Sequence, residues 1–350
     1  MPGPMSPAPA PSHAASPAWL LAVRAMLLTF AVFVVLGSVL QALHPPTGIW
    51  TSELLVFFGL SALLVTRSGR HPFRYPGLGW TGLGPLVVGF LLGTLNFFAL
   101  VAPLQLMMQA IFPESWVQAF DGSRIFEGLA PWELWAVIGG VTLAAPFCEE
   151  YFFRGVLQQG LARRSGAQAR ALVITSVIFS LFHLDPVGFV GRLELGLLFG
   201  LLYLRTGSLW APIGAHMANN AVSAALFLAG QGVEAPEANA LPDPAAIAGI
   251  AGIGGIFFLA LLWGIHISPA LLPPRAMGPE VPLRPPPGAV KAWGLWTGAG
   301  LLALALGFFA SKAGGARAPR PPTTDPLPAV IPVAPSPEAA PPDGLPQRKR

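Results

Sequence analysis

Charged residues and cysteines are scarce in this sequence of 350 residues. Asp, Glu, Lys and Arg make up 10% of the chain. Soluble globular proteins carry about 25%, so an ordinary soluble domain is excluded. The single cysteine, Cys148, excludes an intramolecular disulfide and any metal site that needs several thiolates. Residues 1–17 lack the basic stretch that begins a secretory signal peptide, so we expect the first apolar run to remain as a helix.

Long apolar runs dominate what is present. Hydrophobic residues form 53% of the chain, and its mean hydropathy is +0.62. A helix needs about 20 apolar residues to cross a bilayer. We therefore expect an all-α fold, a polytopic transmembrane helix bundle with eight or nine spans and disordered ends. The expected spans are 18–43, 52–66, 84–111, 131–161, 170–184, 190–205, 208–229, 246–267 and 292–310.

Three of the connecting segments are rich in basic residues, namely 67–83, 162–170 and 267–291. Basic loops stay on the cytoplasmic side of a membrane. We therefore expect an integral protein of the cell membrane, in contact with the lipid bilayer, whose N-terminus is cytoplasmic. The basic residues behind the pI of about 9.7 are spread over loops and the last three positions, so no nucleic-acid partner is expected.

Three ionisable residues interrupt the apolar run 131–161: Glu149, Glu150 and Arg154. Charges at membrane depth are costly, so they indicate a functional site by default. Glu150 and Arg154 are four residues apart on one helix face and can form an ion pair. Such a pair can serve the structure of the helix alone or support a functional site. Glu149 is rotated from Glu150 by about 100°, so it is left for chemistry.

Two further spans carry polar residues. His183 follows Phe179 by one helical turn, and His216 and Asn220 share a helix face. Buried polar groups must find partners, so we expect the three spans to bring these groups to one site. Elsewhere, Glu53 and Arg192 lie near span ends, where long side chains reach the interface, and Asn219 is assigned to packing. No chemistry is expected of these three.

Two interpretations of such a site remain open. In one, Glu149 acts as general base on a water molecule, while the histidines and the amide orient the water and stabilise an oxyanion. In the other, Glu149, His183 and His216 bind a zinc ion that activates the water. Both predict hydrolysis of an amide bond. Cys148 as a nucleophile is disfavoured, because a lone cysteine in an apolar helix usually acts as a small hydrophobic residue.

Three motifs thus follow one another in the chain: Glu149-Glu150-x-x-x-Arg154, Phe179-x-x-x-His183 and His216-x-x-x-Asn220. This ordered set resembles the signature of the CPBP family of intramembrane proteases. The family comprises CAAX prenyl proteases and bacteriocin-processing enzymes, and it is related to the type II CAAX endopeptidases, also called the ABI family. The matching core runs roughly from 130 to 230.

The resemblance implies an intramembrane endopeptidase, labelled a metalloprotease in much of the family, in which Glu149 activates water with or without a metal. It implies a membrane protein or peptide as substrate, such as a CAAX-type tail, a leader or a C-terminal anchor. It implies that Glu150 and Arg154 support the site. It implies that His183 and His216 bind or polarise the substrate carbonyl, the water or a metal. It also implies that Asn220 completes the oxyanion site.

The chain then divides into five parts. These are a disordered N-terminal segment 1–17, N-terminal transmembrane helices 18–130, a catalytic core 131–230, C-terminal transmembrane helices 231–312 and a Pro/Ala-rich disordered tail 313–350. The tail cannot bury enough apolar surface to fold.

Two other functions fit the same residues. Carboxylates and histidines in a membrane also form proton relays, so a proton-coupled transporter is one alternative. A catalytically silent relative that acts as an immunity or scaffold protein is the other. The combination of one free carboxylate, two histidines and an amide suits hydrolysis better than a relay.

Overall fold

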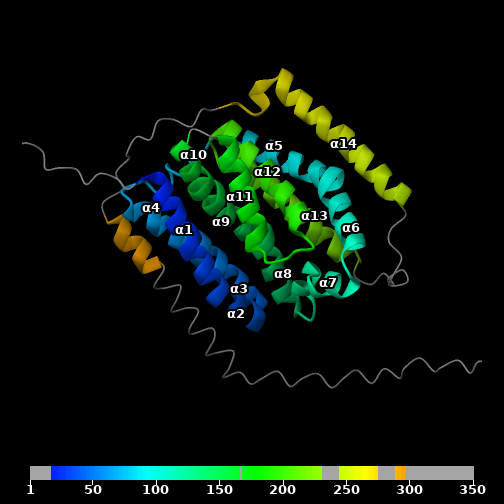
Figure 1. The fold of residues 1–350 in the computed structure, drawn as a ribbon, viewed down its shortest axis with the longest axis horizontal. Coiled ribbons are helices and arrows are strands. Elements are labelled where there is room, and N and C mark those ends of the chain that lie inside the picture. Colours follow the sequence, from blue (N-terminus) through cyan, green and yellow to red (C-terminus); the bar gives the residue numbers. More distant parts are fainter. Residues whose placement is uncertain (1–16, 166–167, 231–243, 275–287, 297–350) are drawn as a thin grey trace, which may run out of the picture. The chain divides into compact units, whose positions relative to one another are not determined.

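The structure is a computed structural model that describes residues 17–165, 168–230, 244–274 and 288–296. Every regular element within these ranges is a helix (Figure 1), so the predicted all-α fold is confirmed. The described residues all belong to one compact unit, residues 1–305. Residues 1–16, most of the expected ninth span and the predicted tail lie outside the described residues.

The N-terminal helices form three long stretches interrupted by π-helical turns. The first is α1 Ala18–Val32, η1 Phe33–Gly37 and α2 Ser38–Leu43; the second is α3 Pro45–Thr51, η2 Ser52–Leu60 and α4 Ser61–Arg67; the third is α5 Leu83–Asn96, η3 Phe97–Val101 and α6 Ala102–Ile111. The short helix α7 (Glu114–Ala119) and the 3-10 turn η4 (Gly122–Phe126) follow.

The motif-bearing stretch comes next and is continuous from residue 131 to 165. It consists of α8 Pro131–Gly139, η5 Gly140–Ala144, α9 Ala145–Glu150, η6 Tyr151–Gln158 and α10 Gln159–Ser165. The remaining elements are α11 Gln168–Phe182, α12 Phe189–Thr206, α13 Trp210–Gly230, α14 Pro244–Ile267 and the 3-10 turn η7 Pro269–Leu271.

Five stretches within the described ranges are long and apolar enough to cross a membrane. They are Ala18–Leu43, Pro45–Arg67, Leu83–Ile111, Pro131–Arg163 and Pro244–Ile267. The chain is therefore an integral membrane protein, but the predicted count of eight or nine spans is not confirmed. The difference lies in three central helices: α11 has 15 residues, α12 carries three charged side chains, and polar motif residues lower the hydropathy of α13.

Pro146 leaves one backbone carbonyl of the motif-bearing stretch without a helical partner. In the π-helical turn before it, the Ala145 N–H donates to Gly140 O, five residues back. The same spacing would pair the Val141 carbonyl with the nitrogen of Pro146, which carries no hydrogen. The Val141 carbonyl is therefore available to a side chain from another helix.

Glycines allow α5 and α13 to pack with their backbones in contact. A Cβ added to Gly89 would overlap Ala211 O, and one added to Gly93 would overlap Ala215 O. Such small-residue contacts hold helices together in membranes, where lipid removes the hydrophobic drive for association. Because Ala215 precedes His216, this contact also fixes the position of that histidine along α5.

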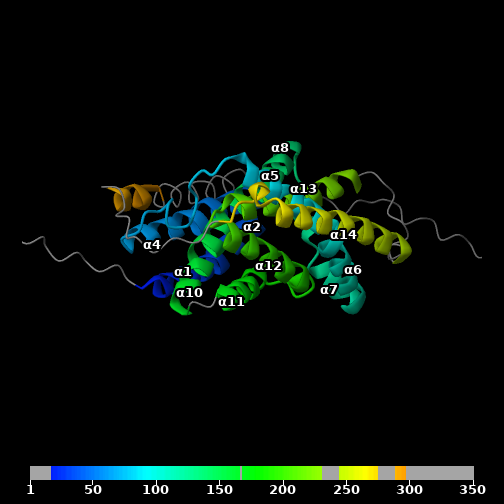
Figure 2. The ribbon, with the colours of Figure 1, turned by 90° about the horizontal axis from the view of Figure 1, so that it is seen from above.

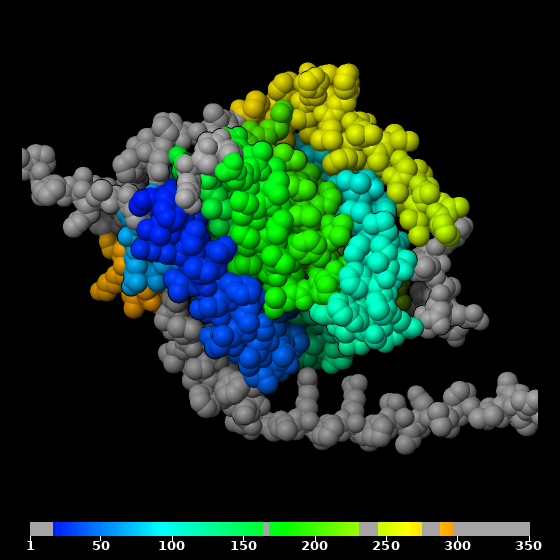
Figure 3. All heavy atoms as spheres, in the orientation of Figure 1, coloured from blue at the N-terminus to red at the C-terminus, as the bar shows by residue number. Residues whose placement is uncertain are grey.

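The helix α12 lies between α11 and α13 (Figures 1 and 2), and both pairs pack in contact. Gly196 brings α12 against α11, because a Cβ there would lie 2.9 Å from Ser176 Cα. The helix α12 also contacts the turn η6, while α13 contacts α9. In Figure 3 the helices of residues 168–206, drawn in green, lie between the blue N-terminal helices and the cyan α5 and α6.

The helix α14 packs along α5 and η3, with Gly254 against Phe98. Only 6% of its most apolar window is buried. Its exposed side chains are large and apolar: Ile253, Ile256, Phe257, Leu259 and Trp263. An apolar helix surface of this extent suits lipid rather than water.

We expect Gly93→Ala to lower the thermal unfolding temperature of the protein in detergent. The added methyl group meets a backbone carbonyl that cannot move aside, and such overpacking costs about 1–3 kcal/mol. The matched control is Gly84→Ala on the same helix, where the added Cβ has nothing within 4 Å and should be neutral or slightly stabilising. Equal unfolding temperatures for the two variants would contradict the packing described.

Candidate active site

Glu150 and Arg154 form a fully buried ion pair, as their spacing predicts. Arg154 Nη1 lies 2.8 Å from Glu150 Oε1, and both side chains are 0% exposed. Arg154 Nη2 donates to Gly196 O at 3.2 Å, which ties the pair to α12. The guanidinium also lies over the rings of Phe179 and Phe199, at 4.6 and 5.2 Å. These cation–π contacts help to stabilise a charge that has no water around it.

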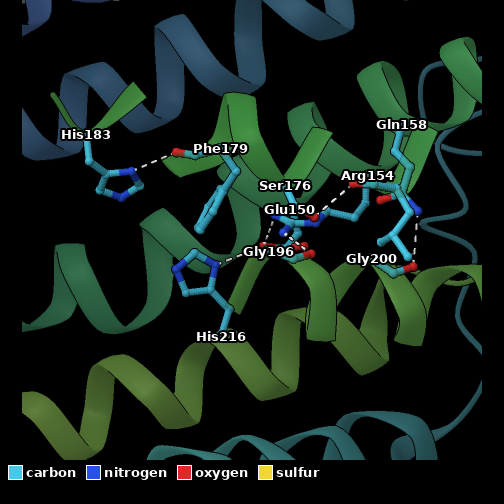
Figure 4. Close-up of polar contacts among 10 residues, drawn as sticks. Glu150, Arg154, Gln158, Ser176, Phe179, His183, Gly196, Gly200 and His216 are labelled. Atoms are coloured by element: carbon cyan, nitrogen blue, oxygen red, sulfur yellow. Dashed lines mark hydrogen bonds and ion pairs between the residues drawn. The ribbon is translucent and has the colours of Figure 1, made fainter. Parts of the chain in front are cut away.

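The same carboxylate oxygen binds His216. His216 Nδ1 lies 2.9 Å from Glu150 Oε1, so Glu150 lies between Arg154 and His216 (Figure 4). A carboxylate paired with arginine only accepts hydrogen bonds, so Nδ1 must carry the imidazole proton. The His216 ring stacks on Phe199, with centroids 4.8 Å apart. Its Nε2 is then a hydrogen-bond acceptor when the ring is neutral.

His183 is held in the same tautomer by a different partner. Its Nδ1 lies 2.9 Å from the carbonyl oxygen of Phe179 (Figure 4), which can only accept. Phe179 is in the last turn of α11, where backbone carbonyls lack helical partners, and this explains the four-residue spacing. Neither Nε2 atom of the two histidines has a hydrogen-bond partner in the described part of the chain.

Four of the six predicted site residues line one cavity of about 370 Å³: Glu149, His183, His216 and Asn220. They come from three separate helical stretches. Glu149 is 9% exposed, and its Oε2 has no hydrogen-bond partner among the described residues. Glu150 and Arg154 do not line the cavity and lie behind His216. The structure therefore places four of the predicted residues at the cavity and the buried ion pair outside it.

Asn220 is held by the carbonyl that Pro146 leaves available. Its Nδ2 donates to Val141 O at 2.7 Å, and its Oδ1 accepts from Asn219 Nδ2 at 3.0 Å. One hydrogen of the Asn220 amide nitrogen is used in this way and the second is left. The proline thus positions a side chain on another helix.

Sequence reasoning missed three residues that also line this cavity: Glu53, Arg192 and Asn219. They were expected to have no part in the site, and their position differs from that expectation because all three line the cavity. Glu53 is 5% exposed and its Oε2 lacks a partner among the described residues. The rule that charges inside spans indicate function could have found Glu53, because it lies within the expected span 52–66.

The zinc interpretation needs three protein ligands close together. Histidines that bind metals usually donate their other ring N–H to a carboxylate or carbonyl, which is how His183 and His216 are held. In the part of the chain that the structure describes, however, no three His, Cys, Asp or Glu side chains form a group that could hold a metal ion. The described residues therefore do not group the three ligands that this interpretation needs.

Comparison with known proteins supports the motif assignment. Residues 131–222 match the family model described as type II CAAX prenyl endopeptidase Rce1-like. The resemblance is confirmed over this segment. It begins with α8 and ends two residues after Asn220, so all six predicted site residues lie within it.

Two curated relatives from Bacillus subtilis (strain 168) are similar to parts of the chain. An uncharacterized protein, YyaK, is 31% identical over 137 residues, which are 37% of this chain and 44% of the relative. The putative membrane peptidase YdiL is 33% identical over 79 residues, 23% of this chain and 32% of the relative. The chain therefore spans less than half the length of either relative. No solved structure matches it.

We expect Arg154→Met to lower the unfolding temperature strongly, because it leaves Glu150 as a buried charge without its main partner. Removing one member of a buried pair costs about 3–5 kcal/mol. Arg24→Met is the matched control, since Arg24 is exposed on α1. The double variant Glu150→Gln/Arg154→Met should recover part of the loss. If Arg154→Met unfolds at the temperature of the control, the pair does not stabilise the fold as described.

Proposed function

We propose that the protein is an intramembrane endopeptidase that hydrolyses a peptide bond in a membrane-associated protein or peptide, with water activated by Glu149. One observation supports this most directly. A buried carboxylate with an unpartnered oxygen shares a cavity with two imidazoles. In each ring Nδ1 donates to a fixed acceptor, and Nε2 is left as a hydrogen-bond acceptor. The family match over residues 131–222 and the similarity to a putative membrane peptidase support the same reaction class.

The proposed reaction begins with a water molecule that donates one hydrogen bond to Glu149 and one to a histidine Nε2. Glu149 takes the first proton as the water oxygen forms a bond to the carbonyl carbon of the substrate. The tetrahedral intermediate then breaks its carbon–nitrogen bond. The leaving nitrogen receives the proton from Glu149, so the carboxylate is restored and atoms and charges balance.

The negative oxygen of the intermediate needs a hydrogen-bond donor. Neutral His183 and His216 cannot donate from Nε2, because their ring protons are on Nδ1. The second hydrogen of the Asn220 amide is the donor that we propose. Its nitrogen is held in place by the bond to Val141 O.

We also propose a location for the reaction. The basic connections 67–83, 162–170 and 267–291 favour the cell membrane with a cytoplasmic N-terminus. Substrates would then be membrane proteins or peptides, including CAAX-type tails, leaders or C-terminal anchors.

Glu149→Gln should abolish cleavage while leaving the unfolding temperature close to that of the wild type. Losing a general base typically lowers the rate by about 10²- to 10⁴-fold. The measurement is mass spectrometry of new peptide termini after membrane proteins are incubated with purified enzyme in liposomes. Glu127→Gln, an exposed glutamate on a loop, is the control and should cleave normally. Wild-type turnover by Glu149→Gln would refute the assignment. Absence of cleavage by both the wild type and Glu127→Gln would favour the transporter or the silent relative.

A strong chelator should leave the cleavage rate unchanged, and later addition of zinc should not raise it. The reason is that the proposed base is the Glu149 carboxylate rather than a hydroxide bound to a metal. The same liposome assay measures both steps. Loss of activity on chelation, with recovery on adding zinc, would establish the metal version instead.

A further inference from the structure

The cavity at Glu149 continues into a second one. The second cavity is about 440 Å³ in volume and extends between η3, η4 and α13. Both cavities are lined by His183, Arg192 and Asn220, whereas Glu149 and His216 line only the first. The two cavities therefore adjoin as one cleft, and Arg192 lines both of its halves.

Arg192 is fixed at this junction by one edge of its guanidinium. Its Nη1 donates to Asp185 Oδ2 at 2.6 Å. Asp185 is itself held by the loop before α12, because its Oδ1 accepts the N–H groups of Val187 and Gly188 at 2.9 and 3.0 Å. A Cβ on Gly188 would overlap Arg192 Nη1 and lie 2.6 Å from Asp185 Oδ2. The pair therefore depends on a glycine at position 188.

The other edge of the guanidinium is left for a ligand. Arg192 Nε and Nη2 have no acceptor in the described part of the chain, and the side chain is 26% exposed. Arg192 is also the one arginine or lysine among the described residues that line the cleft. It forms no ion pair there with the cleft carboxylates Glu53, Glu149 or Asp121. A fixed cation with free hydrogen-bond donors attracts an anion that can enter the cleft from outside.

We propose that Arg192 is a specificity-determining residue that binds a carboxylate of the substrate in this cleft. A guanidinium fork matches two carboxylate oxygens in geometry and charge. The carboxylate is either a free C-terminus or an Asp or Glu side chain. Arg192 lines both cavities, so the carboxylate that it binds would lie where they meet. The proposal rests on the proposed protease function.

The test uses binding rather than cleavage. Purified Glu149→Gln protein in detergent is incubated with three pools of short apolar peptides, and the retained peptides are counted by mass spectrometry. The first pool has free C-terminal carboxylates, the second has C-terminal carboxamides, and the third has carboxamides with one internal Glu. We expect the first or the third pool to be retained about tenfold more than the second, a difference of about 1.4 kcal/mol. The pool that is enriched identifies the source of the carboxylate.

Variants in the same Glu149→Gln background show whether Arg192 causes the preference. Arg192→Gln should abolish it, and Arg192→Lys should retain part. Gly188→Ala keeps every charge and should also remove most of the preference, because its methyl group displaces the guanidinium. Arg24→Gln, which removes an exposed charge on α1, should leave it intact. Unfolding temperatures confirm that each variant is folded.

Equal retention of the three pools, retention of none, or a preference that survives Arg192→Gln would each overturn the proposal. The proposed function is tested separately by wild-type cleavage. Absence of cleavage together with a carboxylate preference that depends on Arg192 would refute the protease and leave a carboxylate-binding cleft. Cleavage without the preference would refute the role of Arg192 alone.

Discussion

One buried carboxylate holds the candidate site together. Glu150 accepts hydrogen bonds from Arg154 and His216 through a single oxygen, in a place with no exposure to solvent. Hydrogen bonds to charged groups strengthen where the dielectric constant is low, while unpaired charges there are costly. The three side chains therefore form one unit, which links the motif-bearing stretch to α12 and α13. Its chemical consequence is the tautomer of His216, whose Nε2 is left as an acceptor in a ring that lines the same cavity as Glu149.

Backbone features position the rest of the site. Lipid gives little drive for helices to associate, so close contacts and interhelical hydrogen bonds must fix their positions. The glycines of α5 set the position of α13, and the carbonyl left by Pro146 holds Asn220. A proline in one helix and glycines in another thus determine where two side chains of a third helix lie. The reactive groups are placed by backbone geometry as much as by side-chain contacts.

Three features of the structure follow from the sequence. Long apolar runs predict the all-α fold, the four-residue spacing predicts the pairing of Glu150 with Arg154, and the need of buried polar groups for partners predicts that Glu149, His183 and His216 share one place. These follow from local spacing and from the need of buried polar groups for partners. The span count is not confirmed, because the helices that line the polar site are short or carry polar residues that lower their hydropathy.

Contacts between helices do not follow from residue spacing in the sequence. Spacing gives the face on which a residue lies but not the helix that faces it, so Glu53 and Arg192 were assigned to span ends. The π-helical turns add to this difficulty, because each one rotates the residues that follow relative to an α-helical count. The bond from Asn220 to Val141 O depends on such a turn. It follows from Pro146 only once the turn is known.

The central claim is that Glu150 fixes the proton of His216 on Nδ1 and so leaves its Nε2 as a hydrogen-bond acceptor for the water of the proposed reaction. Nitrogen NMR of protein labelled with ¹⁵N-histidine, with His216 assigned by substitution, measures this directly. The account predicts a protonated Nδ1 and a bare Nε2 in the wild type, and loss of that preference in Glu150→Gln. A His216 ring protonated on Nε2 in the wild type would contradict it.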